Sequence, residues 1–143
     1  MAVLITGGGG FLGLHLAQAL VARGEEVVIG DVNIRVKLPN GLEGKVKLVV
    51  CDVSSPISFF EAVHANHIEG IYHLAVAIRT IAEQNPGMAH GVNINGAYNL
   101  LETARICGVP RVVFISSHSV FPPGTKVVQT ETRPMQYANT YGI

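Results

Sequence analysis

A run of glycines close to the N-terminus is the first feature of the sequence that could do chemistry. Within residues 6–13, Gly8, Gly10 and Gly13 fit the spacing GxGxxG, while Gly7, Gly10 and Gly13 fit GxxGxxG. Both spacings let the backbone turn tightly against a pyrophosphate, and a following helix offers free N–H groups and the positive end of its dipole. Because a glycine loop can also be a plain flexible turn, the flanking segments must decide between the two.

An acidic residue, Asp31, follows the loop at the distance of about 20 residues that a dinucleotide site requires. At the end of a strand, its carboxylate can accept hydrogen bonds from the hydroxyls of an adenosine ribose and would repel a 2′-phosphate. The alternative is a solvated aspartate in a turn. The loop and the acid together favour NAD over NADP, and the nearby Arg35 and Lys37 keep NADP open.

The segments around these residues alternate between two types of element. Strands are predicted over residues 2–6, 26–29, 47–50, 70–74 and 111–116, and helices over residues 11–21, from residue 56 onward and over 86–107. This alternation predicts an α/β fold with a doubly wound parallel sheet. Right-handed crossovers and the glycine-rich first turn predict the strand order 3-2-1-4-5. Residues 32–46 are expected to form an irregular crossover, and residues 118–143 a loop.

Composition and charge exclude several classes of partner. The length of 143 residues fits one domain. The chain has 10 Lys+Arg and 10 Asp+Glu, so its formal net charge is zero. Because proteins that bind nucleic acid or anionic membranes carry an excess of basic residues, neither is expected as the main partner. No apolar run reaches the roughly 18 residues of a membrane span, and the N-terminus lacks the basic stretch of a signal peptide. Cys51 and Cys107 have no paired spacing, so we expect buried free thiols in a cytoplasmic protein. His64 and His67 give HxxH on the predicted second helix, but nothing completes a zinc-like set, so no metal site is expected.

The domain is also expected to be incomplete. Hydrophobic residues make up 48% and charged residues only 14%, compared with about 25% charged residues in an average domain. The apolar fifth strand would leave a hydrophobic sheet edge, which folded proteins usually pair or cover. The chain also stops where a sixth helix would begin. We therefore expect residues 1–143 to be the front part of a longer protein, without its later strands and its substrate domain.

Seven short motifs then follow one another in a recognisable order. They are TGGGGFLG at 6–13, Asp31, Asp52-Val53, HLA at 73–75, NING at 93–96, SSHSVF at 116–121 and YGI at 141–143. In this order they resemble the extended short-chain dehydrogenase/reductases, specifically the NAD-dependent epimerase/dehydratase family with its TGxxGxxG, HLA, NVNGT, SSxxVYG and YGxxK motifs. The resemblance spans essentially the whole chain. Phe121 stands where the family has tyrosine.

The resemblance implies an NAD(P)-binding Rossmann domain, with Asp31 on the ribose and Asp52-Val53 on the adenine. The cofactor contacts that it implies are Gly7, Gly10, Phe11, Leu12, Gly13, Asp31, Asp52, Val53, Leu74, Ala75, Val76, Asn93 and Ser116.

The resemblance also implies a catalytic pair. Tyr141, as tyrosinate, would take a proton from a substrate hydroxyl while hydride passes to nicotinamide C4, and Ser117 would hydrogen-bond the same substrate oxygen. The family's lysine would fall at position 145, beyond Ile143. Because an ordinary tyrosine has a pKa of about 10, forming tyrosinate at pH 7 costs roughly 4 kcal/mol without such help. We therefore expect the complete protein to be an enzyme and residues 1–143 alone to be inactive.

The resemblance leaves the reaction open. It implies an NAD-dependent epimerase or dehydratase of a nucleotide-sugar or, alternatively, a dehydrogenase of a sugar acid or small hydroxy compound. A third reading is a non-catalytic NAD-binding module, if the chain truly ends at Ile143. Many relatives dimerise through their long helices, so a homodimer through residues 86–107 is a further expectation.

Overall fold

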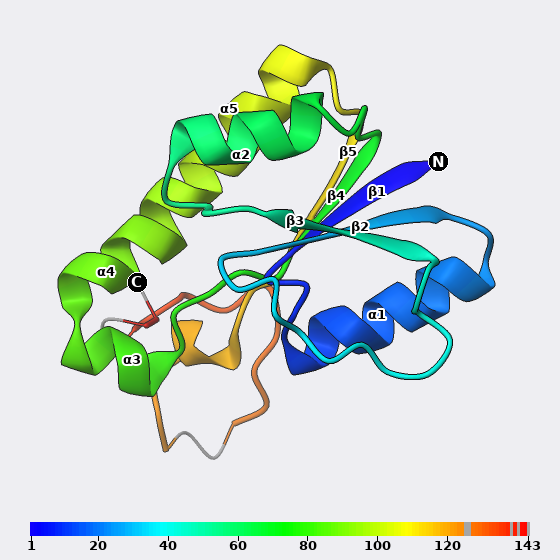
Figure 1. Cartoon of the computed structure of the whole chain (residues 1–143). Coiled ribbons are helices and arrows are strands. Elements are labelled where there is room, and N and C mark those ends of the chain that lie inside the picture. Colours follow the sequence, from blue (N-terminus) through cyan, green and yellow to red (C-terminus); the bar gives the residue numbers. More distant parts are fainter. Residues whose placement is uncertain (125–126, 138, 140, 143) are drawn as a thin grey trace.

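A five-stranded parallel sheet forms the centre of the chain in the computed structural model, which describes residues 1–124, 127–137, 139 and 141–142 (Figure 1). The strand order is β3-β2-β1-β4-β5, as predicted. The strands are β1 (Ala2–Thr6), β2 (Glu26–Asp31), β3 (Val46–Val50), β4 (Gly70–His73) and β5 (Arg111–Phe114). The order reverses between β2 and β4, on the two sides of β1. Ligands of doubly wound sheets bind at such a reversal, outside the carboxyl ends of the strands.

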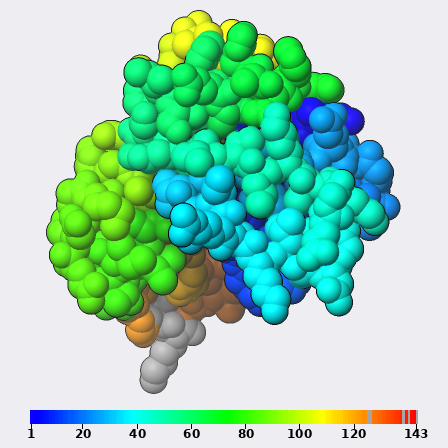
Figure 2. Space-filling view, in the orientation of Figure 1, coloured from blue at the N-terminus to red at the C-terminus, as the bar shows by residue number. Residues whose placement is uncertain are grey.

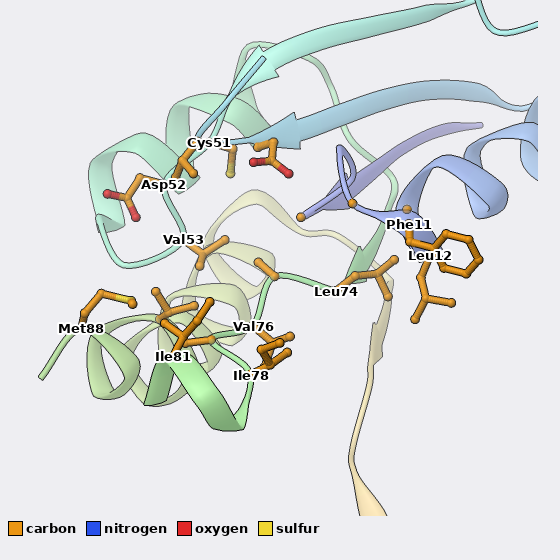
Figure 3. A pocket seen from close by; sticks show the side chains of 18 residues that line it. Phe11, Leu12, Cys51, Asp52, Val53, Leu74, Val76, Ile78, Ile81 and Met88 are labelled. Atoms are coloured by element: carbon orange, nitrogen blue, oxygen red, sulfur yellow. The ribbon is translucent and has the colours of Figure 1, made fainter. Parts of the chain in front are cut away.

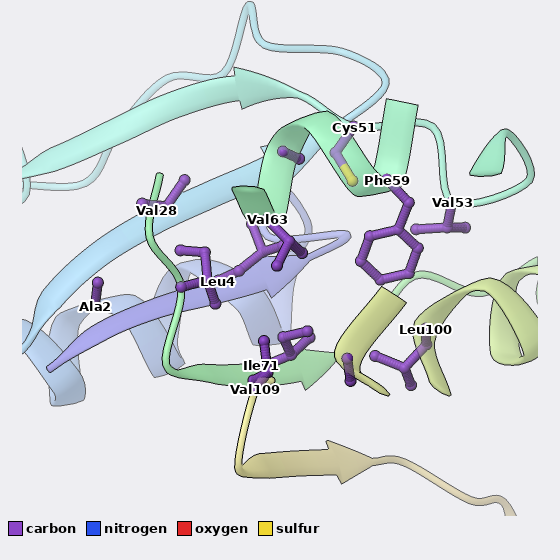
Figure 4. Packing of buried hydrophobic residues seen from close by; sticks show 13 residues of the cluster. Ala2, Leu4, Val28, Cys51, Val53, Phe59, Val63, Ile71, Leu100 and Val109 are labelled. Atoms are coloured by element: carbon purple, nitrogen blue, oxygen red, sulfur yellow. The ribbon is translucent and has the colours of Figure 1, made fainter. Parts of the chain in front are cut away.

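Helices cover both faces of the sheet (Figure 1). On one face, α1 (Phe11–Ala22) buries Ala17 and Leu20 against β1 and β2. On the other face, α2 (Pro56–His64) and α5 (Gly96–Cys107) pack around Phe59 and Leu100, both fully buried (Figure 4). Strand β1 is buried along its whole length, because it lies in the middle of the sheet between these two layers. No helix in the described part of the chain is long and apolar enough to cross a membrane.

The segment between β2 and β3 forms no helix, which confirms the predicted irregular crossover. It still contributes to the core, because Leu42 is fully buried against the α1 layer. Gln18 of α1 donates a hydrogen bond from Nε2 to the carbonyl oxygen of Asn40 at 3.3 Å. In the space-filling view, this blue-to-cyan segment lies beside the green segment that follows β4 (Figure 2).

The predicted helix over residues 86–107 is one helical run with an irregular turn inside it. It consists of α4 (Pro86–His90), a π-helical turn (Gly91–Asn95) and α5, which ends at Gly108 with a left-handed φ of 67°. The sequence did not predict α3 (Arg79–Gln84), a short helix that precedes this run. Asn85 separates the two, and its Oδ1 accepts a hydrogen bond from the backbone N–H of Met88 at 3.1 Å.

Several predicted boundaries were wrong by a few residues. Strand β5 ends at Phe114 instead of Ser116, because its only partner in the described sheet, β4, ends at His73, which pairs with Phe114. The predicted apolar edge is present, with Phe114 and Ile115 about half exposed, at 53% and 52%. A short 3-10 helix (His118–Val120) lies in the region predicted as a loop.

Two smaller expectations also need correction. The second helix ends at His64, so His67 lies outside it with a positive φ of 49°, and the HxxH pair does not share one helix. Cys51 is buried as predicted, whereas Cys107 is only partly buried, and both are free thiols.

A buried histidine at the end of β4 makes stability depend on pH. The ring of His73 stacks between those of Phe59 and Phe114, with centroid separations of 5.9 and 5.6 Å. Burial lowers the pKa of His73 from 6.5 to about 4, so the folded chain holds this ring neutral. The unfolded chain takes up the proton first as the pH falls, and folding then loses stability between pH 6.5 and about 4.

We predict that this one group removes on the order of 3 kcal/mol from the free energy of unfolding across that window. The measurement is urea denaturation at a series of pH values, for the wild type and for His73→Asn, which does not titrate. The variant should show a shallower decline than the wild type. Parallel curves for the two proteins would contradict the assignment.

Candidate functional site

A pocket of about 650 Å³ lies at the carboxyl ends of β1 to β4, where the strand order reverses (Figure 3). Its walls come from the glycine loop, the end of β2, the loop after β3 and the loop after β4. The volume falls within the range of about 300–1,000 Å³ that is usual for small-molecule and cofactor sites. The position and size are those of a nucleotide site in a doubly wound sheet.

The glycine loop lies directly against the loop that follows β4. Gly7 has a φ of +63°, and a Cβ atom there would stand 2.8 Å from the backbone N and Cα of Ala75. A Cβ on Gly13 would stand 2.5 Å from the backbone of Gly8, so the loop also folds tightly onto α1. No side chain caps the N-terminus of α1 at Gly10. Phe11, Leu12 and Gly13 of the first turn line the pocket, so the unpaired N–H groups of this turn lie at the cavity, which is the arrangement that binds phosphate.

Asp31 is fixed at the edge of the pocket by two backbone groups. Its Oδ2 accepts a hydrogen bond from the N–H of Gly9 at 3.1 Å, and its Oδ1 accepts one from the N–H of Asn33 at 3.1 Å. The carboxylate thus connects the end of β2 to the glycine loop. This orientation leaves it lining the pocket, where it can accept further hydrogen bonds from hydroxyl groups.

A hydrogen bond between buried side chains joins β1 to β4 below the glycine loop. Thr6 Oγ1 and His73 Nδ1 are 2.9 Å apart, and both residues are buried. Thr6 Oγ1 also accepts a long hydrogen bond, 3.5 Å, from the N–H of Ala75. The same hydroxyl therefore holds the backbone of the β4 loop at the level of Gly7.

The loop after β3 forms the wall nearest Asp31. Asp52 Oδ1 accepts hydrogen bonds from the N–H and the hydroxyl of Ser54, at 2.9 and 2.6 Å, which fixes the turn into α2. Cys51 lines the pocket beside it. Burial, with smaller contributions from the charges of Asp52 and Asp31, raises the pKa of the Cys51 thiol to about 12. The thiol therefore stays protonated and behaves as an apolar wall.

A second pocket of about 250 Å³ adjoins the first, and Val76 lines both. It brings together Ser116, Ser117 and Tyr141, which come from two separate segments of the chain. Ser117 Oγ accepts a hydrogen bond from the N–H of Ser119 at 3.2 Å. Its own proton is then free to be donated to a molecule in the pocket.

The structure places all predicted site residues on the walls of these two pockets. The larger pocket holds Gly7, Gly10, Phe11, Leu12, Gly13, Asp31, Asp52, Val53, Leu74, Ala75 and Val76; the smaller holds Val76, Asn93, Ser116, Ser117 and Tyr141. Thr140 and Ile143, which flank the tyrosine in its motif, lie outside the described residues. The binding and catalytic roles of these residues remain predictions.

Sequence reasoning missed some of the lining residues. The larger pocket also contains Ile78 and Ile81, which come with the unpredicted helix α3, and Met88 from α4. The smaller pocket contains His90, an exposed residue of α4. These positions could not be predicted from the sequence, because residues 77–90 contain no recognisable motif. They come to the pocket only when this segment folds against it.

Comparisons with known proteins agree with this geometry. Residues 3–143 match the model of the NAD dependent epimerase/dehydratase family. The chain is 36% identical over 156 residues to D-erythronate dehydrogenase of Cupriavidus necator, covering 100% of this chain and 47% of that protein. It is 32% identical over 151 residues to UDP-glucose 4-epimerase of Neisseria gonorrhoeae, covering 99% and 44%. The crystal structure of Thermus thermophilus UDP-glucose 4-epimerase in complex with NAD superposes with a TM-score of 0.82 at 31% identity, covering 99% and 46%. The chain thus spans slightly less than half the length of these relatives.

The contact at Gly7 gives a prediction with a matched control. Gly7 and Gly24 both have positive φ, +63° and +77°, but a Cβ on Gly24 would meet nothing within 4 Å. Gly7→Ala and Gly24→Ala therefore share the conformational cost of about 1–2 kcal/mol, and only Gly7→Ala adds overlap with Ala75. We expect urea denaturation to show a loss for Gly7→Ala that exceeds the loss for Gly24→Ala by about 1–3 kcal/mol. Equal losses in the free energy of unfolding for the two variants would mean that the glycine loop does not touch the loop after β4.

Proposed function

The chain belongs to the NAD-dependent epimerase/dehydratase family, and from that membership we propose that it forms the cofactor-binding part of an oxidoreductase that moves hydride between NAD and a hydroxyl-bearing carbon of its substrate. One observation carries the proposal: two pockets share Val76, and one is lined by the glycine loop and Asp31, the other by Ser117 and Tyr141. A dinucleotide in the first pocket would present its reactive ring to the second.

The residues of the larger pocket fit NAD. The uncapped helix N-terminus behind the glycine loop suits a pyrophosphate, which can approach the backbone closely at Gly10, where there is no side chain. Gly7 and Gly13 instead let the loop pack against the chain itself. Asp31 suits the hydroxyls of the adenosine ribose, and the apolar wall at Cys51 and Val53 suits the adenine ring. Bound NAD supplies the nicotinamide C4 that accepts hydride, and the chain supplies orientation and proton transfer.

Ser117 and Tyr141 would handle the substrate hydroxyl. The Ser117 hydroxyl, already accepting from the N–H of Ser119, can donate to the substrate oxygen and hold it in line. The phenolate oxygen of Tyr141 would accept the hydroxyl proton as the C–H bond gives up hydride to the cofactor. Because the lysine of the family motif would fall at position 145, we propose this step for the protein that carries both residues, and no turnover for residues 1–143 alone.

The substrate is proposed as a nucleotide-sugar, with a sugar acid or another small hydroxy compound as the alternative. The relatives include both UDP-glucose 4-epimerases and D-erythronate dehydrogenases. The side chains of the smaller pocket suit a hydroxyl-bearing substrate of either kind. A binding module without turnover remains the third candidate, and it shares the NAD pocket with the other two.

A homodimer through the helical run Pro86–Cys107 is also proposed. On this run, Ile94, Tyr98 and Leu101 are exposed at 41%, 68% and 63%, whereas Leu100 and Ala104 are buried against the sheet. Ile94, Tyr98 and Leu101 are spaced as one helical stripe, which is the pattern of a helix–helix contact. A monomeric mass in light scattering at micromolar concentration would contradict this proposal.

The charge of Asp31 is expected to select NAD over NADP. Asp31→Asn keeps one oxygen for the N–H of Gly9, gives up the second acceptor used by the N–H of Asn33, and removes the negative charge that a 2′-phosphate would meet. We expect the wild type to bind NAD more tightly than NADP. The variant should reduce the ratio of the two dissociation constants by about tenfold or more, because the hydrogen bonds from the ribose hydroxyls of NAD to a charged carboxylate, which contribute about 1.5–3 kcal/mol, are weakened. Calorimetric titration measures both constants. An unchanged ratio would contradict the assignment, and no NAD binding by the wild type would refute the proposed function.

The catalytic assignment is tested in the protein that carries this chain together with the family lysine. Tyr141→Phe should lower kcat by about 10²–10⁴-fold, the range of general acid–base catalysis, with NAD affinity unchanged. The assay follows NADH at 340 nm together with the sugar products. Accumulating NADH indicates a dehydrogenase. A converted sugar without net NADH indicates an epimerase, or a dehydratase if the product has lost water. Full activity in the variant would exclude Tyr141 as the base.

A further inference from the structure

One polar residue of the smaller pocket has no part in the proposed hydride transfer. The polar side chains on the walls of this pocket are those of His90, Asn93, Ser116, Ser117 and Tyr141. Asn93 uses both ends of its amide on the backbone of Ala77, at 2.8 and 3.1 Å. Ser116, Ser117 and Tyr141 already have proposed contacts with the cofactor or the substrate. His90 is left without a role, although it lines the same cavity.

The position of His90 follows from the packing of α4 beside Tyr141. Ala89 is buried in a small cluster with Ala77 and Ala82, and Tyr141 packs against this cluster. His90 is the next residue along the chain and the last residue of α4. Because Ala89 anchors the end of α4 beside the tyrosine, His90 lines the same cavity as Tyr141, with an exposed side chain.

The ring of His90 is available to a ligand. Among the described residues, none forms a hydrogen bond or an ion pair with this ring. His73, by contrast, is buried, and its Nδ1 lies 2.9 Å from Thr6 Oγ1 in a hydrogen bond. An imidazole has one N–H donor when it is neutral and two when it is protonated. His90 can therefore donate a hydrogen bond to a molecule in the smaller pocket.

The charge of the smaller pocket favours an anion. None of the described residues on its walls is Asp, Glu, Lys or Arg. His90 is thus the only described wall residue that can carry a positive charge near neutral pH, and no carboxylate of these walls competes for its N–H groups. An ionised carboxylate is an acceptor only, and its hydrogen bonds are stronger than those between neutral groups. A carboxylate is therefore the ligand group that suits His90 best.

The size of the pocket limits which part of a substrate it would hold. Its volume of about 250 Å³ lies below the range of about 300–1,000 Å³ that is usual for whole ligands. The cavity therefore suits the unit that bears the reacting hydroxyl, next to Ser117 and Tyr141, and not a complete nucleotide-sugar. The anion at His90 is then a carboxylate of that unit instead of the pyrophosphate of a nucleotide.

We propose that His90 is a specificity-determining residue that binds a carboxylate on the unit carrying the reacting hydroxyl. The substrate is then a hydroxy acid, either a free sugar acid or the uronic acid unit of a nucleotide-sugar. This inference rests on the proposed function, because it assumes that the substrate hydroxyl lies at Ser117 and Tyr141. It narrows the proposed substrate class to compounds with a carboxylate.

The test measures how two matched pairs of compounds bind to the protein that carries this chain together with the family lysine, loaded with NADH. Because bound NADH cannot accept hydride, the hydroxy compounds bind without reacting. One pair is D-erythronate and erythritol, and the other is UDP-glucuronate and UDP-glucose; within each pair, a carboxylate stands in place of a CH₂OH group. Calorimetric titration gives the four dissociation constants. We expect the carboxylate member of a pair to bind about tenfold or more tightly than its neutral partner.

Three variants identify the group responsible. His90→Gln keeps a hydrogen-bond donor and removes the charge, so it should lower this preference by about tenfold, equivalent to about 1.4 kcal/mol, and leave the neutral partner within about twofold. His90→Lys returns a positive charge and should restore part of the preference, which a loss of packing alone would not allow. His64→Gln is the matched control, because His64 is also an exposed histidine in the last turn of a helix and lines neither of the two pockets. Its dissociation constants should equal those of the wild type.

The outcomes separate this inference from the proposed function. A preference confined to D-erythronate identifies a free sugar acid, and one confined to UDP-glucuronate identifies a nucleotide-linked uronic acid. Either supports the role of His90 if His90→Gln removes it. A wild type that prefers neither carboxylate, or a preference that His90→Gln leaves unchanged, would overturn this role while NADH binding stays in place. A wild type that fails to bind NADH would instead refute the proposed function.

Discussion

The close approach of two loops at the centre of the sheet is the constraint on which the site depends. The backbone at Gly7 lies so near Ala75 that no Cβ fits between them, and the hydroxyl of Thr6 bonds both to His73 and to the N–H of Ala75. The first turn of α1 follows the glycine loop directly and lines the pocket at the carboxyl ends of the strands. A larger residue at Gly7 would separate the walls that make the pocket.

From this contact the two halves of the site follow. The strand order reverses at β1, so the loops after β2 and β3 lie to one side of the glycine loop and the loops after β4 and β5 lie to the other. The first pair carries Asp31 and the apolar wall at Cys51. The second carries Val76 and Ser117, next to Tyr141. The helical run Pro86–Cys107 is bonded to one loop of each pair. Asn99 donates a hydrogen bond to the carbonyl oxygen of Val53 in the loop after β3, and Asn93 accepts one from the N–H of Ala77 in the loop after β4.

Much of this arrangement could be predicted from the sequence, because it depends on local patterns. Short apolar runs predicted the strands, the first three of them ending at glycine or aspartate, and the glycine spacing located the pocket. The sequence could not reveal the six-residue helix Arg79–Gln84, which has no side-chain cap and is too short to show a helical period. The partners of Asn93 and Asn99 were equally hidden, since they are 16 and 46 residues away in the chain. The end of β5 depended on the length of its neighbour and not on its own apolar residues.

We propose that one dinucleotide lies across the sheet from Asp31 to Val76, with its pyrophosphate at the N-terminus of α1. A crystal structure of the protein with NAD tests this most directly. We expect the pyrophosphate within hydrogen-bond distance of the N–H groups of Phe11 and Leu12, the adenosine ribose on Asp31 and the nicotinamide beside Val76, facing Ser117. A dinucleotide bound in the reverse direction, or outside this pocket, would contradict it.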